Sequence, residues 1–61
     1  QPLLEQAMKL SGACLSGSEA KYAIQGGQVK LNGEVQLQRG KKLRHGDVFN
    51  FNGHDYKIIG T

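Results

Sequence analysis

Basic residues are concentrated in one part of this 61-residue sequence, between Lys21 and Arg44. This segment holds six bases and one acid, Glu34, so its net charge is +5, whereas the rest of the chain sums to −2. Such separation creates a local positive potential that the overall net charge of +3 conceals. Phosphate groups would bind there, although a solvated face that serves only solubility is the alternative. The six bases are Lys21, Lys30, Arg39, Lys41, Lys42 and Arg44.

Few other residues could support chemistry. His45 and His54 stand nine positions apart, and neither they nor Cys14 have the close spacing of metal ligands, so we expect no metal and no cofactor. His45 can instead add partial positive charge to the basic segment. Ser16 and Ser18 have no general base arranged beside them to activate a nucleophile, which favours helix capping. We therefore predict a protein without enzymatic activity.

Length and composition exclude several classes of protein. Sixty-one residues form one domain, residues 1–61, whose core is too thin for a deep pocket, so we expect no small-molecule substrate. The single Cys excludes a disulfide framework, and no apolar run reaches the roughly 18 residues of a membrane span. A free thiol without a visible leader segment predicts a cytoplasmic protein. We expect no membrane association and a monomer.

The first expected element is a short helix with one apolar stripe. Pro2 suits its first turn, where a missing N–H costs nothing, and Ser11-Gly12 should end it. Because the helix is short, packing must hold it in place. The apolar stripe consists of Leu3, Leu4, Ala7 and Met8.

A second helix should follow over residues 16–25. Ser16-Gly17-Ser18-Glu19 is the pattern of a capping box, with Ser16 as N-cap and Glu19 reaching back. Gly26-Gly27 supplies a left-handed end. The predicted buried face consists of Ala20, Ala23 and Ile24, and the opposite face of Ser18, Lys21, Tyr22 and Gln25.

Beyond Gly27 the apolar period changes from helical to two, which predicts short strands. Asn32-Gly33 and Asn52-Gly53 are strong hairpin signals, and Gly46-Asp47 predicts a further turn. The chain should therefore be an α+β domain, with two short N-terminal helices packed on a small antiparallel sheet of three to five strands. The apolar strand positions are Val29, Leu31, Val35, Leu37, Val48, Phe49, Phe51, Tyr56, Ile58 and Ile59, and we expect the aromatic residues and the isoleucines among them to be buried.

Residues 16–33 resemble the small RNA-binding domain named after the fourth protein of the small ribosomal subunit, also called the alpha-L motif. The family pattern is roughly S-R-x-x-A-x-x-x-I-x-x-G-x-V-x-V-N-G, followed later by G-D-x-I. The similarity covers about residues 16–51 and is closest to the short, stand-alone bacterial members. The matching positions are Ser16, Ala20, Ile24, Gly27, Val29, Asn32 and Gly33, with Gly46, Asp47 and Val48 in the later element.

The resemblance implies non-catalytic binding of structured RNA, ribosomal or transfer RNA, in translation or ribosome assembly. It brings the helix over residues 16–25 and a basic loop over residues 39–44 onto one RNA backbone, where the helix N-terminus would favour a phosphate. Gly17 replaces an Arg that the family often uses at the helix start to touch RNA, which removes one expected phosphate contact. The implied RNA-binding residues are Ser16, Ser18, Lys21, Tyr22, Lys30, Arg39, Lys41, Lys42, Arg44 and His45.

Several alternatives stay open at this stage. Tyr22 could stack on an exposed base, or its ring could lie flat on a neighbouring strand. Parts of the pattern also resemble a β-grasp module that acts as a sulfur carrier or binds proteins and does not bind RNA. The chain could equally be a domain of a larger RNA-modifying enzyme.

Overall fold

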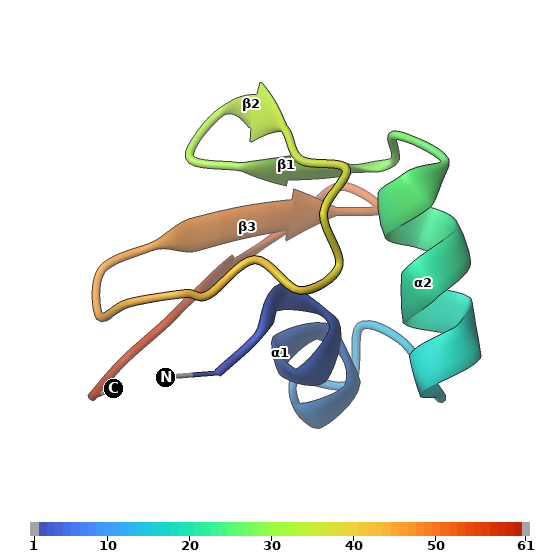
Figure 1. Cartoon of the computed structure of the whole chain (residues 1–61). Coiled ribbons are helices and arrows are strands. Elements are labelled where there is room, and N and C mark those ends of the chain that lie inside the picture. Colours follow the sequence, from blue (N-terminus) through green and yellow to red (C-terminus); the bar gives the residue numbers. More distant parts are fainter. Residues whose placement is uncertain (1, 61) are drawn as a thin grey trace.

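The computed structural model describes residues 2–60 and shows two helices followed by four strands (Figure 1). All strand pairings are antiparallel, and the spatial order is β2-β1-β3-β4. The chain between β2 and β3 crosses in front of the sheet toward the start of α1 (Figure 1). The predicted α+β class is thereby confirmed. The elements are α1 (Leu4–Leu10), α2 (Gly17–Gln25), β1 (Val29–Leu31), β2 (Glu34–Val35), β3 (Val48–Phe51) and β4 (His54–Lys57).

The second helix has the ends that its sequence predicts. Ser16 is the N-cap, and its Oγ accepts a hydrogen bond from the Glu19 backbone N–H at 3.2 Å. Within residues 2–60, Glu19 makes no return bond to Ser16, so only half of the capping box forms. Gly27, with a φ of +78°, provides the left-handed residue just beyond the helix.

The first helix begins two residues later than Pro2, so the placement of Pro2 in its first turn was wrong. Leu3 is the N-cap and pairs with Lys42 in an isolated antiparallel bridge. The Pro2 carbonyl accepts a hydrogen bond from Leu43 N–H at 2.8 Å. Pairing with a distant segment holds this stretch extended, and the helix starts at Leu4 only where that pairing ends.

Both hairpins form at the expected turns, with positive φ at Asn32 and Gly33 and again at Asn52 and Gly53. The strands are shorter than their apolar pattern predicts. The second strand ends at Val35 because the chain then leaves the sheet toward α1, and Leu37 is 56% exposed. Similarly β4 ends at Lys57; Ile58 remains buried but Ile59 does not, so burial of Ile59 was wrongly predicted.

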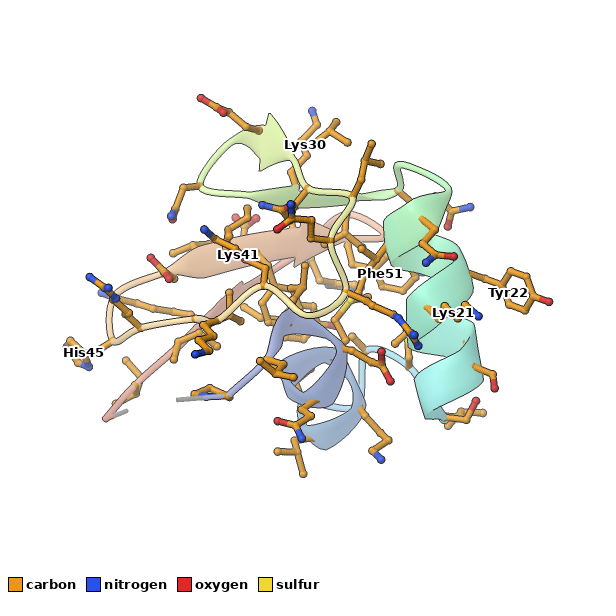
Figure 2. The ribbon with its side chains drawn as sticks, in the orientation of Figure 1. Lys21, Tyr22, Lys30, Lys41, His45 and Phe51 are labelled. Carbon is orange, nitrogen blue, oxygen red and sulfur yellow. The ribbon has the colours of Figure 1, made fainter. Side chains whose placement is uncertain are left out.

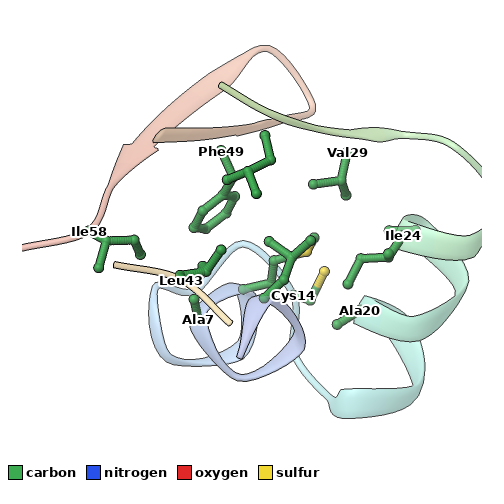
Figure 3. Packing of buried hydrophobic residues seen from close by; sticks show 12 residues of the cluster. Ala7, Cys14, Ala20, Ile24, Val29, Leu43, Phe49 and Ile58 are labelled. Atoms are coloured by element: carbon green, nitrogen blue, oxygen red, sulfur yellow. The ribbon is translucent and has the colours of Figure 1, made fainter. Parts of the chain in front are cut away.

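One hydrophobic core lies between the helices and the sheet (Figure 3). Phe49 is buried and stacks on Tyr56 with ring centroids 4.9 Å apart. Phe51 and Tyr56 pack against the same cluster but are only half-buried, so the predicted burial of the aromatic strand residues is complete only at Phe49. Cys14 is a buried free cysteine, and this burial, followed by the charge of Glu19, raises the pKa of its thiol. The cluster consists of Leu4, Ala7, Met8, Cys14, Ala20, Ala23, Ile24, Val29, Leu31, Leu43, Phe49 and Ile58.

Candidate nucleic-acid interface

All ten residues that the sequence singles out are exposed to solvent. They do not form a single cluster. Figure 2 shows Tyr22 pointing away from α2 at one end of the molecule and His45 at the opposite end, with Lys41 between them. The interface is therefore built from parts that different elements position, and each part has its own geometry.

The basic loop, residues 39–44, is fixed to the start of α1 through its backbone. The carbonyl of Lys41 accepts a hydrogen bond from Leu4 N–H at 2.8 Å, and that of Arg39 accepts one from Glu5 N–H at 3.1 Å. Helix N–H groups in the first turn lack partners within the helix, so these carbonyls satisfy groups that would otherwise need water or a side-chain cap. The first turn of α1 and the basic loop thus stabilise each other.

A single apolar side chain in the basic loop anchors it to the core. Leu43 is fully buried beside Ala7, whereas Lys42 and Arg44 on either side of it are exposed (Figure 3). In extended backbone, successive side chains point to opposite sides. Burying Leu43 therefore directs the flanking bases into solvent.

Two polar side chains join the β1–β2 turn to the turn before β3. Asp47 Oδ1 accepts a hydrogen bond from Asn32 Nδ2 at 3.2 Å, and Asp47 Oδ2 accepts one from Arg44 N–H at 2.9 Å. Asn32 Oδ1 in turn accepts one from Val48 N–H at 3.0 Å. We call this arrangement the Asn32–Asp47 clamp. It ties the end of the basic loop to the central strands.

Beside the clamp lies a hollow of about 450 Å³, which we call the basic groove. Three cations surround it, and Leu31 provides an apolar wall. The Arg44 N–H bond, followed by the Asn32 bond and the charges of Arg44 and Lys41, lowers the pKa of the Asp47 carboxyl. Asp47 is therefore an anion at neutral pH, engaged by the clamp. The groove is lined by Leu31, Asn32, Lys41, Lys42, Arg44 and Asp47.

Only one base of the candidate interface is in an ion pair. Arg39 Nη1 lies 3.6 Å from Glu5 Oε2, and this is the sole salt bridge within the described part of the chain. The side chains of Lys41, Lys42 and Arg44 form none there. The groove thus presents positive charge that no acidic side chain pairs with directly.

The polar face of α2 carries a second group of candidate residues. Ser16 is committed to capping, whereas Ser18 and Lys21 are exposed along the first turns. Tyr22 is 77% exposed, so its ring does not lie flat on a strand and that alternative is wrong. An exposed aromatic ring on a polar helix face is available to stack on a base.

Two further candidates lie away from both groups. Lys30 projects from the sheet face opposite the core, where its cross-strand neighbours are Val35 and Asn50. His45 is exposed, and its Nδ1 accepts a hydrogen bond from Gly60 N–H at 2.8 Å. Lys30 and His45 therefore belong neither to the hollow beside the clamp nor to α2.

Sequence reasoning missed the residues that position this surface. It assigned Asn32 and Asp47 to turns and to the family motif and predicted no contact between them, although the pattern of Asn-Gly followed by Gly-Asp does mark both ends of the clamp. It assigned nothing to Glu5, which lies outside the basic segment and carries no motif. Contacts across more than thirty positions of sequence, such as Glu5 with Arg39, have no local signal.

Residues 2–60 contain no group of three or more His, Cys, Asp and Glu side chains that could hold a metal ion. Neither helix in that range has the length and apolar character needed to cross a bilayer.

Comparison with known proteins adds an independent line of information. The model of the S4 domain family matches residues 3–59. The chain is similar to "Putative RNA-binding protein YbcJ" of Escherichia coli (strain K12) and to "Uncharacterized protein YbcJ" of Shigella flexneri. Each relative is 38% identical over 52 residues, which is 85% of this chain and 74% of the relative. The match includes α1 and β4, well beyond the motif in residues 16–51.

Proposed function

Because this chain belongs to the S4 domain family, we propose that it binds structured RNA by its backbone and shape and catalyses no reaction. The RNA partner proposed is ribosomal or transfer RNA, and the setting is translation or ribosome assembly in the cytoplasm. The protein acts as a monomer. The name of the Escherichia coli relative supports RNA as the class of partner.

The observation that carries this proposal is the basic groove. Lys41, Lys42 and Arg44 converge on one hollow and have no ion-pair partner within residues 2–60. The Asp47 carboxylate lines the same hollow, but it accepts its hydrogen bonds from Asn32 and the Arg44 backbone and forms no salt bridge with these cations. Their side chains therefore stay available for phosphate groups, and each such contact releases condensed counterions from the nucleic acid. Such contacts supply affinity and register without reading sequence.

The exposed ring of Tyr22 adds a different kind of contact. Base stacking on an aromatic side chain is tolerant of sequence and does not depend on charge. Unstacked bases occur at loops, bulges and junctions, whereas a regular RNA helix offers only its backbone and shallow minor groove. The combination of groove and ring therefore favours RNA in which a duplex adjoins unpaired nucleotides.

A salt series tests the proposal directly. Binding of a ribosomal RNA helix-junction fragment is measured by fluorescence titration between 50 and 200 mM salt. If about four bases contact phosphates, log affinity should fall with log salt at a slope near −3 to −4, at roughly 0.7–0.9 per contact. Lys41→Ala and Lys42→Ala should each weaken binding to all structured RNAs alike and reduce that slope by nearly one.

Lys57→Ala is the matched control, because Lys57 is an exposed lysine on β4 that does not line the basic groove. It removes the same charge and should leave the slope almost unchanged. An equal loss for Lys57→Ala and Lys41→Ala would contradict the proposed surface. No binding to any cellular RNA would favour the protein-binding alternative.

A further inference from the structure

Glu5, in the first turn of α1, contacts both the basic loop and the start of α2. Its backbone N–H, in the first turn of α1, donates to the Arg39 carbonyl of the basic loop at 3.1 Å. Its carboxylate pairs with Arg39 Nη1 at 3.6 Å through Oε2. Its other oxygen, Oε1, lies against Gly17, where a Cβ atom would be only 3.1 Å away. One acidic residue thus joins α1, the basic loop and the start of α2.

This carboxylate lies close to the start of α2. The first turn of a helix carries partial positive charge and attracts negative groups. Glu5 Oε1 already lies there, at the first residue of a nine-residue helix. The lack of a side chain at Gly17 provides the room, since a Cβ at 3.1 Å would force the carboxylate to shift.

The same carboxylate also reduces the charge that Arg39 offers to RNA. The Glu5 side chain is 30% exposed and that of Arg39 is 51% exposed, so the pair lies at the surface. A cation that is already paired releases fewer counterions from RNA than a free one, because its neighbouring carboxylate repels the phosphate. Lys41, Lys42 and Arg44 form no salt bridge within residues 2–60, and the Asp47 carboxylate in their groove is held by the clamp.

We infer that Glu5 is a specificity-determining residue that screens Arg39 and the first turn of α2 from RNA phosphates. It thereby confines binding of the RNA phosphate backbone to the basic groove. It also lowers the affinity for RNA whose backbone would otherwise cross the start of α2. The inference rests on the proposed function, because it concerns how that RNA surface is limited. It also revises the expectation that the N-terminus of α2 holds a phosphate.

Glu5→Gln tests the inference, because it removes the charge and keeps the backbone hydrogen bond to Arg39. In the same salt series, the variant should bind RNA more tightly than the wild type and with a slope steeper by roughly 0.7–0.9. Its advantage should be about threefold larger at 50 mM than at 200 mM salt. Arg39→Ala should change wild-type affinity little but should reduce the gain in the Glu5→Gln background, leaving only the part that comes from the start of α2.

Asp55→Asn is the matched control, since it changes the net charge equally on β4, where Asp55 accepts a hydrogen bond from Asn50. The slope of log affinity against log salt for Asp55→Asn should equal that of the wild type. A Glu5→Gln variant that binds no more tightly, or that gains no more than Asp55→Asn, would overturn the inference. So would a double variant with Arg39→Ala that keeps the full gain.

A readout without RNA separates this inference from the proposed function. Inorganic phosphate is titrated into both proteins while the backbone amide signals of Gly17, Ser18 and Glu19 are followed by NMR. Larger shifts in Glu5→Gln than in wild type would support screening at α2 even if neither protein bound RNA. Equal shifts would refute it even if both did. A similar melting temperature for the two proteins would confirm that the effect is not a loss of fold.

Discussion

The basic groove and the first turn of α2 both attract anions, but they differ in whether an acidic side chain of the protein already lies there. In the groove, Lys41, Lys42 and Arg44 surround open space, and the one nearby anion, Asp47, is engaged by the clamp. At α2, the Glu5 carboxylate lies against Gly17 and pairs with Arg39. The number of basic residues in a segment of sequence therefore does not give the positive charge that is accessible to a binding partner.

The two regions also differ in how they are held. The basic loop depends on distant contacts, namely burial of Leu43, the clamp, and hydrogen bonds to the start of α1. The polar face of α2 depends on local signals, because Ser16 caps the helix and Gly27 follows its end. Substitutions that loosen the loop should therefore disturb the groove and the core together, whereas substitutions on the α2 face should leave the fold intact.

Leu43→Ala should have the largest effect. Removing a fully buried leucine costs about 2–5 kcal/mol, and a domain of this length has a free energy of unfolding of only about 3–9 kcal/mol at 0.05–0.15 kcal/mol per residue. Urea unfolding followed by circular dichroism measures the loss. Leu37→Ala, at an exposed leucine on the same connection, should change stability by no more than about 0.5 kcal/mol. Equal effects of the two substitutions would show that the loop is not anchored as described.

Local chemistry explains why much of this fold could be predicted from its sequence. The Asn-Gly turns, the Ser16 cap and the positive φ at Gly27 each depend on a few adjacent residues, and all appear in the structure. The apolar pattern alone extended β2 to Leu37, but the chain leaves the sheet after Gln36 to dock on α1. That docking depends on residues near the N-terminus, in and just before α1, so no pattern within the loop itself could predict it.

The candidate site shows the same division. Its basic residues and Tyr22 were identified by type and position, and all prove to be exposed. Their grouping was not predictable, because the clamp joins residues fifteen positions apart and Glu5 reaches both Arg39 and Gly17. The role of Glu5 depends on where a carboxylate lies in space, which residue type alone does not indicate.

Tyr22→Ala should have an intermediate effect that sharpens the contrast between the two regions. If the exposed ring stacks on an unpaired base, its removal should weaken binding by about 1–3 kcal/mol. Stacking involves no counterion release, so the salt slope should stay unchanged, unlike that of Lys41→Ala. Fluorescence titration against the same RNA fragment across the salt series measures both quantities.

Tyr22→Phe provides the control, because it keeps the aromatic ring and should retain nearly all the affinity. The expectation fails if Tyr22→Ala binds as tightly as wild type. It also fails if the loss varies with salt as it does for the groove lysines, since the face of α2 would then act through charge rather than stacking.

The smallest effect concerns the pH dependence of the clamp. Hydrogen bonds from Arg44 N–H and Asn32, together with nearby positive charges, lower the pKa of Asp47 below its ordinary value of 3.8 in the folded protein. A group whose pKa is lowered by folding stabilises the protein above the unfolded value and loses that contribution as pH falls through the folded value. The free energy of unfolding should therefore fall as pH drops below about 4, and Asp47→Asn should make that fall shallower.

Asn32→Gly should also make the fall in stability at low pH shallower, but by less than Asp47→Asn. It removes one of the two hydrogen bonds that the Asp47 carboxylate accepts, and glycine tolerates the positive φ of position 32. Any loss of stability that is equal at all pH values cancels when slopes are compared. Urea unfolding at pH 7, 4 and 3 measures the slope for wild type and both variants. If Asp47→Asn left the slope unchanged, the clamp would not depend on the charge of Asp47. The groove would then be shaped by the Leu43 anchor and the backbone contacts to α1 alone.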